Sequence, residues 1–255
     1  MVSEFFQGIV RWEVERNGTK RTLPYFYQDC LSLTAAYTAS TAEVRKLIPY
    51  PDVHPLELIP GRCVVIFGAF ESRATDVEPF DEVTISFLVT HPHRQVFLIP
   101  LLGAMITEVF RTYTWKLPVS TEFCRSGGVD LFDAPKYIAD IKFQEAAGWV
   151  QCSWSEDRSE VLNLKGRVLP TKRGKLMRYI SFGFNYGNRL MTNVLVNPLE
   201  TAQTWDMNAF ELTMGKNHPV CKTLSSIKLS RYPLLYQYTP RYEQILFPAR
   251  NIIDV

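Results

Sequence analysis

The sequence predicts an α+β protein made mainly of antiparallel strands, with a few short helices. Runs of β-branched and aromatic residues recur at short intervals along the whole chain. Polar turns separate these runs, and helical periodicity is confined to short segments. Many short strands at close spacing favour a sheet that closes, or nearly closes, into a barrel.

The first element expected is a β-hairpin. Asn17 and Gly18 separate two strand-like runs, residues 9–16 and 20–27. Both residue types tolerate positive φ at the two central positions of a tight turn, so this pair is typical of a two-residue hairpin connection.

Downstream of the hairpin, the pattern predicts two short helices among a series of strands. Ser40 and Glu43 have the spacing of a capping box, and the apolar residues that follow recur at helical intervals up to Pro49. Residues 121–131 are predicted as a second helix, interrupted by Gly127 and Gly128. Strands are predicted over residues 63–69, 83–90, 95–100, 149–154, 161–168, 176–184, 190–196 and 210–213.

Length and composition indicate one domain that acts on a small molecule. With 255 residues and 46% hydrophobic content, residues 1–255 are predicted as a single domain, with 1–27 as an N-terminal hairpin extension. A formal net charge of +2 gives no electrostatic footprint for nucleic acid or for an anionic membrane. Five cysteines without a Cys-x-x-Cys pair, and the lack of an export signal or membrane-length apolar run, predict a cytoplasmic protein.

Lys136 is the most informative candidate residue. It directly follows Pro135, and apolar residues flank it on both sides. An amine held among apolar groups loses hydration of its charged form, so its pKa is expected to fall toward neutrality and free a carbonyl nucleophile. On the residue pattern alone, a lysine after a proline is more often a solvated surface charge, and that alternative stays open.

The segment 127–141 resembles the active-site segment of the acetoacetate decarboxylase superfamily, in which a Gly-rich helical stretch leads to Pro-Lys. The Pro-Lys pair and the aromatic-x-Glu segment 80–82 are the most specific matches. Further pieces that look similar, in the same order, are residues 37–49, 55–57, 218–220 and 236–241.

The resemblance implies a cone-shaped antiparallel barrel with Lys136 inside it, forming a Schiff base with a small keto acid. In that family the lysine is known to be activated by desolvation or by a neighbouring cation. Glu82 is implied to face the lysine and transfer protons, although an exposed acid at the start of a strand is the plain alternative. Cys30, Phe132 and Ala134 are placed at substrate-binding positions. The resemblance implies no cofactor, no metal ion and a homo-oligomer.

Three departures from the family pattern bear on the substrate. Tyr137 stands where the family's decarboxylases have a second lysine, and Cys30 stands where they have an arginine for the substrate carboxylate. Another arginine, such as Arg21 or Arg125, would have to take that place, or the substrate is not acetoacetate. About a dozen residues around 105–115 look inserted relative to the family spacing.

The predicted function is therefore a Schiff-base-forming carbon–carbon lyase, similar to a decarboxylase, that acts on a small keto acid. Two alternatives stay open. One is an aldolase or dehydratase of the same superfamily that uses the same lysine. The other is a non-catalytic barrel that binds a small apolar ligand.

Overall fold

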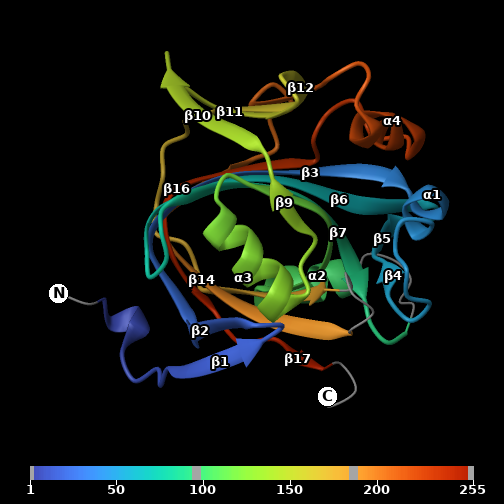
Figure 1. Cartoon of the computed structure of the whole chain (residues 1–255). Coiled ribbons are helices and arrows are strands. Elements are labelled where there is room, and N and C mark those ends of the chain that lie inside the picture. Colours follow the sequence, from blue (N-terminus) through green and yellow to red (C-terminus); the bar gives the residue numbers. More distant parts are fainter. Residues whose placement is uncertain (1–2, 94–98, 184–188, 252–255) are drawn as a thin grey trace.

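Seven strands of one sheet close into a barrel in the computed structural model, which describes residues 3–93, 99–183 and 189–251 (Figure 1). In order around the barrel they are β7, β6, β3, β16, β14, β13 and β8, and pairing of β8 with β7 completes the closure. All these neighbours are antiparallel except β8 and β13, which are parallel. Their bounds are β3 (Tyr25–Ser40), β6 (Arg62–Thr75), β7 (Phe80–Thr90), β8 (Val109–Val119), β13 (Met177–Gly183), β14 (Leu190–Thr204) and β16 (Leu235–Leu246).

Alternation along the strands gives the barrel wall two different faces. On β7, Glu82 and Thr84 line an interior cavity, whereas Val83 and Ile85 are fully buried in a core on the outer face. This follows from the two-residue period of a strand, which sends neighbouring side chains to opposite faces.

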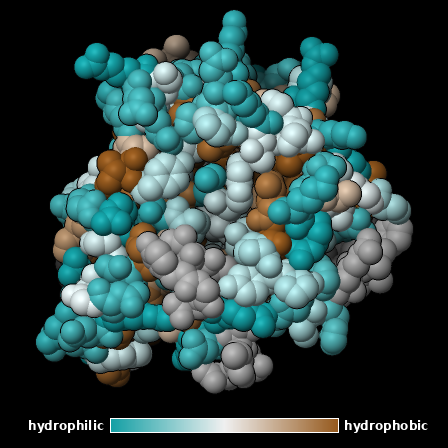
Figure 2. Space-filling view, turned by 45° about the vertical axis from the view of Figure 1, so that its right-hand side comes forward, coloured by the Kyte–Doolittle hydropathy of each residue, from teal (hydrophilic) through white to brown (hydrophobic). Residues whose placement is uncertain are grey.

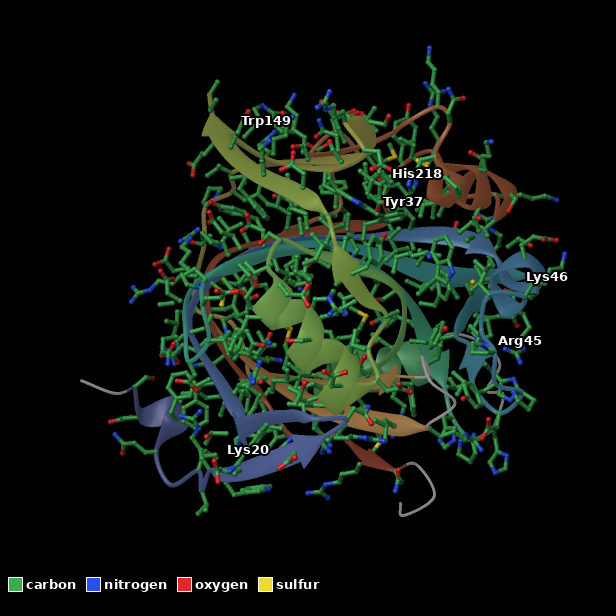
Figure 3. The ribbon with its side chains drawn as sticks, in the orientation of Figure 1. Lys20, Tyr37, Arg45, Lys46, Trp149 and His218 are labelled. Atoms are coloured by element: carbon green, nitrogen blue, oxygen red, sulfur yellow. The ribbon has the colours of Figure 1, made fainter. Side chains whose placement is uncertain are left out.

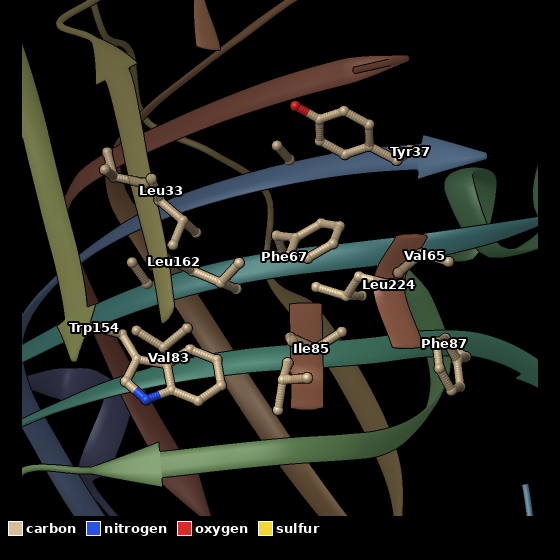
Figure 4. Close-up of a cluster of buried hydrophobic side chains, with 14 of the residues drawn as sticks. Leu33, Tyr37, Val65, Phe67, Val83, Ile85, Phe87, Trp154, Leu162 and Leu224 are labelled. Carbon is tan, nitrogen blue, oxygen red and sulfur yellow. The ribbon is translucent and has the colours of Figure 1, made fainter. Parts of the chain in front are cut away.

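A second sheet covers the outer face of the barrel. It contains β10 (Asp140–Ala146), β11 (Trp149–Glu156), β12 (Ser159–Arg167) and β15 (Phe210–Met214), and α4 (Pro219–Ser226) lies beside it (Figure 1). Figure 4 shows the core between these layers, where Trp154 and Leu162 of the second sheet meet Phe67 and Ile85 of the barrel. Burying a side chain of this size contributes about 1.5–3 kcal/mol, so this interface holds the second sheet in place.

The remaining elements lie around the barrel ends. Helix α3 (Glu122–Phe132) fills one opening, and the hairpin of β1 (Trp12–Arg16) and β2 (Thr19–Leu23) lies next to it (Figure 1). Tyr37 of β3 and His218, the N-cap of α4, lie on the side of the barrel that faces the second sheet (Figure 3). The other elements are the 3-10 helix η1 (Glu4–Phe6), α1 (Thr41–Arg45), β4 (His54–Pro55), β5 (Glu57–Ile59), α2 (Ile99–Thr107), β9 (Lys136–Ile138) and β17 (Arg250–Asn251).

The structure confirms the predicted fold class and corrects several element boundaries. The hairpin turns at Asn17 and Gly18 as predicted, but the run 20–27 breaks at Pro24 into β2 and the start of β3. Ser40 is the N-cap of α1, although its hydroxyl makes no capping hydrogen bond. The predicted strand 95–100 is wrong at its end, since α2 begins at Ile99, and its residues 95–98 lie outside the described residues, as does Phe184.

The outer surface seen in Figure 2 is mostly hydrophilic, and its apolar residues form small separate groups. Across the described ranges, every helix is too short or too polar to cross a membrane.

Candidate active site

The end of α3 and the turn after it place Lys136 inside the barrel. Thr121 caps the start of α3 by accepting a hydrogen bond from the backbone N–H of Cys124. At the other end, Asp133 adopts the left-handed conformation with a φ of 53°, and the backbone N–H of Ala134 donates to the carbonyl of Gly128. Such a left-handed residue ends a helix and reverses the chain. Lys136 then begins β9, which runs parallel to β8.

The ammonium group of Lys136 contacts one carboxylate, one thiol and one aromatic ring. Its Nζ atom lies 2.7 Å from Oε2 of Glu82 and 3.0 Å from Sγ of Cys124. The Phe80 ring centroid is 5.3 Å from the same nitrogen, within the range of a cation–π contact. The Lys136 and Glu82 side chains are only 11% and 18% exposed, so this is a largely buried ion pair.

The pKa of Lys136 is raised above its usual value, so the predicted fall toward neutrality is wrong. Burial acts to lower this pKa, but the nearby Cys124 and Glu82 side chains together outweigh it. Burial also raises the pKa of Cys124 to about 11, which makes that side chain a neutral thiol at neutral pH. Cys124 and Glu82 both act to raise the pKa of Lys136, and Glu82 is the carboxylate in direct contact with its Nζ atom. Apolar neighbours in the sequence did not reveal this carboxylate because it comes from β7, 54 residues away along the chain.

The glycine pair in α3 makes room for the site and does not interrupt the helix as predicted. A Cβ atom on Gly128 would collide with the aliphatic part of Lys136, with the Lys136 Cε atom only 2.7 Å away. A Cβ atom on Gly127 would lie 3.3 Å from Oη of Tyr25. Glycine suits both positions because other side chains approach the helix closely there. The helix continues through both glycines.

A cavity of about 260 Å³ surrounds the ion pair. Glu82 and Lys136 are the only charged side chains among the described residues that line it. Around the lysine the wall is mainly aromatic, with Tyr25, Phe80 and Tyr242 among its members. Farther along the wall, hydroxyl groups are frequent and come from Thr84, Ser86, Thr112, Thr114, Ser181 and Thr192. Within the described ranges, no cluster of three or more side chains is suited to hold a metal ion.

The residues predicted to bind substrate lie at different depths. Phe132 and Ala134 line the cavity. Cys30 is fully buried and does not line the cavity, although its sulfur lies 3.9 Å from the Ser72 hydroxyl, which does. Burial raises the pKa of the Cys30 thiol to about 12, so it brings no charge to the site.

The side chain of Tyr137, the residue after the lysine, points away from the cavity, as strand alternation requires. The Tyr137 ring packs 6.3 Å from that of Trp154, in the core under the second sheet. Arg125, one of the two arginines considered for the carboxylate, lies on α3 and pairs with Glu122 at 2.5 Å. Arg21, the other, lies in β2 beside the cavity.

Comparison with known proteins places the chain in a family. Residues 14–198 match the model of the acetoacetate decarboxylase (ADC) family. The chain belongs to the acetoacetate decarboxylase family. No curated protein sequence matches it significantly.

Solved structures share the fold at low sequence identity. An acetoacetate decarboxylase from Legionella pneumophila subsp. pneumophila str. Philadelphia 1 has 13% identity and a TM-score of 0.65 over 98% of this chain and 93% of its own. The enduracididine biosynthesis enzyme MppR, complexed with the condensation product of pyruvate and imidazole 4-carboxaldehyde, has 11% identity and a TM-score of 0.62 over 90% and 89%. An acetoacetate decarboxylase-like enzyme from Sphingomonas wittichii RW1 has 13% identity and a TM-score of 0.57 over 90% and 92%.

Sequence reasoning missed Cys124 as a neighbour of the lysine. A usable signal was present, because Cys124, Gly128 and Leu131 recur at helical spacing on one face of α3. All three are buried, so that face is the one turned toward the barrel. In the sequence, Cys124 stood out only as one of five cysteines without a Cys-x-x-Cys pair.

Proposed function

We propose that the protein is a Schiff-base-forming lyase that acts on a small keto acid. Lys136 is the nucleophile and Glu82 is the group that accepts and returns its proton. The observation that carries this proposal is the 2.7 Å contact between Lys136 Nζ and Glu82 Oε2 inside a cavity that has no other charged lining residue among those described. Membership of the acetoacetate decarboxylase family supports it.

The first step requires an uncharged amine. The pair is charged at rest, since Glu82 keeps the proton on Lys136. A keto compound that enters the cavity displaces water, and less polar surroundings favour the neutral pair over the ion pair. The proton then moves from Nζ to Oε2, and the free amine attacks the carbonyl carbon.

The later steps use that proton to release water. The protonated Glu82 gives its proton to the departing hydroxyl of the carbinolamine, so water leaves and a cationic imine remains. Glu82 is again a carboxylate, and its negative charge stabilises that cation. The imine accepts the electron pair of the breaking bond as carbon dioxide or a carbonyl fragment departs, and the resulting enamine takes up a proton from water on carbon. Hydrolysis of the imine releases the product and restores Lys136.

A second candidate, a retro-aldol or dehydration reaction, has one observation in its favour. The cavity wall carries the hydroxyl groups of Thr84, Ser86, Thr112 and Thr114, and Ser86 and Thr114 lie 3.1 Å apart. Such a wall can hydrogen-bond to a substrate hydroxyl. The same imine serves decarboxylation and retro-aldol cleavage, which differ in whether carbon dioxide or a carbonyl fragment departs, whereas in a dehydration water departs.

Oxygen exchange tests the proposed function whichever bond is cleaved. Formation and hydrolysis of an imine exchange the ketone oxygen with water, so incubation of acetone, acetoacetate or pyruvate in H₂¹⁸O should label the recovered ketone. Lys136→Met should abolish the enzyme-dependent exchange. Lys142→Met is the matched control, because Lys142 lies on β10 in an exposed pair with Asp140. If none of these compounds exchanges above the uncatalysed rate, the non-catalytic ligand-binding barrel is the better account.

A further inference from the structure

The inner face of strand β7 carries three polar residues that lead away from the nucleophile. Glu82, Thr84 and Ser86 alternate along the strand, and all three line the cavity. Two residues of a strand advance about 6.8 Å, so Ser86 lies about 13 Å along β7 from the carboxylate that pairs with Lys136. The three carbon–carbon bonds of a four-carbon keto acid, about 1.5 Å each, span less than ~5 Å. The cavity therefore extends well beyond the length of such a molecule.

Neighbouring strands continue this polar wall around the barrel. The hydroxyl oxygens of Ser86 on β7 and Thr114 on β8 lie 3.1 Å apart. Thr112 precedes Thr114 by two residues and is opposite Ser181 of β13, which in turn is opposite Thr192 of β14. We call the six hydroxyl-bearing residues of these four strands the hydroxyl belt: Thr84, Ser86, Thr112, Thr114, Ser181 and Thr192.

The hydroxyl groups belong to the cavity side of the wall. On β7, Val83, Ile85 and Phe87 alternate with the belt residues and are fully buried in the core on the outer face (Figure 4). Valine and threonine have similar shapes and both suit a strand. Strand formation alone therefore does not account for threonine on the inner face and apolar residues on the outer face.

Two belt residues are deeply buried, and their hydroxyl groups have no hydrogen-bond partner among the described residues. Thr112 and Thr192 are only 8% and 6% exposed, and both line the cavity. A buried polar group without a partner costs about 1–3 kcal/mol. An apolar chain in this part of the cavity would impose that cost at each position. A chain with hydroxyl groups avoids it, because a hydroxyl both donates and accepts.

The belt itself carries no charge. Among the described residues that line the cavity, only Glu82 and Lys136 are charged, and they neutralise each other. A phosphate or a second carboxylate beside the belt would be buried without a counter-charge, which costs far more than burying a hydroxyl group. The belt therefore favours an uncharged, hydroxylated chain over an apolar or an anionic one.

We propose that the substrate is a keto compound whose chain carries two or more hydroxyl groups, bound by the hydroxyl belt while its ketone lies at Lys136. This inference rests on the proposed function for the ketone and its reaction, but the belt stands on the geometry of the cavity. A six-carbon chain has five carbon–carbon bonds of about 1.5 Å each. Its length is comparable with the ~6.8 Å between successive inward residues, so its hydroxyl groups reach the belt.

Alditols test the belt without imine chemistry, because they carry a hydroxyl group on every carbon and no ketone. Erythritol, xylitol and sorbitol are titrated by ligand-observed NMR, with 1,4-butanediol, 1,5-pentanediol and 1,6-hexanediol as probes of matched length. We expect the best alditol to bind the wild-type protein at least about tenfold more tightly than its matched diol. Thr112→Val and Thr192→Val should each weaken alditol binding about fivefold to tenfold and leave diol binding unchanged.

Thr213→Val is the matched control, because Thr213 is exposed on β15 and does not line the cavity. Valine suits a strand, so the variants should keep the thermal unfolding midpoint. Ser181→Ala removes a belt hydroxyl without adding apolar volume, and it should also weaken alditol binding. Alditols that bind the wild-type protein no more tightly than the diols, or bind all three belt variants as tightly as the wild-type protein, would overturn the belt. Failure of oxygen exchange with normal alditol binding would instead reject only the proposed function.

Discussion

Nζ of Lys136 lies 2.7 Å from Oε2 of Glu82, although 54 residues separate them in the sequence. Strand β7 supplies the carboxylate and the turn after α3 supplies the amine. The consequence is a lysine that is protonated at rest, in place of the free base that its apolar sequence neighbours suggest. The chemistry of the site therefore depends on Glu82 as much as on Lys136.

Replacing Glu82 by Gln should shift the pH dependence of imine formation to lower pH. The pKa of Lys136 is raised in the wild-type protein, so imine formation should keep increasing through the alkaline range as the ammonium loses its proton. Without the carboxylate, one of the two side chains that oppose the effect of burial is gone, so this pKa should fall and imine formation should level off at a lower pH. Turnover should nevertheless fall by about 10²–10⁴-fold, because proton transfer is lost.

Rates of imine formation measured by rapid quench with borohydride across the pH range would check this shift. Glu43→Gln, which removes an exposed carboxylate paired with Lys46 on the far side of the fold, is the control. An identical profile for Glu82→Gln and the wild-type protein would show that Glu82 does not hold the proton.

The Lys136–Glu82 ion pair should also affect the free energy of unfolding. Lys136→Met leaves Glu82 in a largely buried position without its cation, and removal of one partner from a buried pair costs about 3–5 kcal/mol. The double variant Lys136→Met with Glu82→Leu should recover most of this loss, because an apolar pair needs no compensating charge. Urea unfolding provides the measurement. A double variant as unstable as the sum of the two single variants would argue against direct coupling.

Gly128→Ala should displace the lysine. The added Cβ atom would collide with the side chain of Lys136, which cannot move without leaving Glu82. We expect a loss of about 1–3 kcal/mol in unfolding free energy from overpacking, together with a much larger loss of imine formation. Gly127→Ala is the matched control, since its Cβ atom meets only the Tyr25 hydroxyl at 3.3 Å. Equal effects of the two substitutions on imine formation would contradict the role given to Gly128.

Cys124 should resist alkylation in the folded protein. Burial raises the pKa of its thiol to about 11, so the thiol stays largely protonated at pH 8. Iodoacetamide treatment followed by peptide mass mapping should leave Cys124 unmodified until the protein is unfolded. Rapid modification at neutral pH would mean that Cys124 is a thiolate paired with Lys136, and that Glu82 shares its role with this sulfur.

The sequence allowed the fold class, the hairpin at Asn17–Gly18 and the pairing of candidates Lys136 and Glu82 to be predicted. Strand alternation and turn residues are local signals, and the family resemblance supplied the long-range pairing. What could not be predicted depends on contacts across the barrel. The continuous helix through Gly127 and Gly128 is an example, because two glycines normally weaken a helix and only the approach of Lys136 and Tyr25 explains them here.

The position of Cys30 was another such case. The family resemblance led to Cys30, whose side chain is buried and does not line the cavity. The hairpin that carries Arg21 packs against α3 through Asp130, a contact between residues more than a hundred positions apart. Local sequence patterns carry no information on such a contact.

The central claim is that Lys136 forms an imine with a keto compound, and covalent trapping tests it most directly. The wild-type protein is incubated with acetoacetate, pyruvate or levulinate, reduced with borohydride and examined by intact mass and peptide mapping. We predict one adduct, located on Lys136, that is absent from Lys136→Met and retained in Lys142→Met. Adducts spread over exposed lysines, or an unmodified Lys136 with every compound, would contradict the claim.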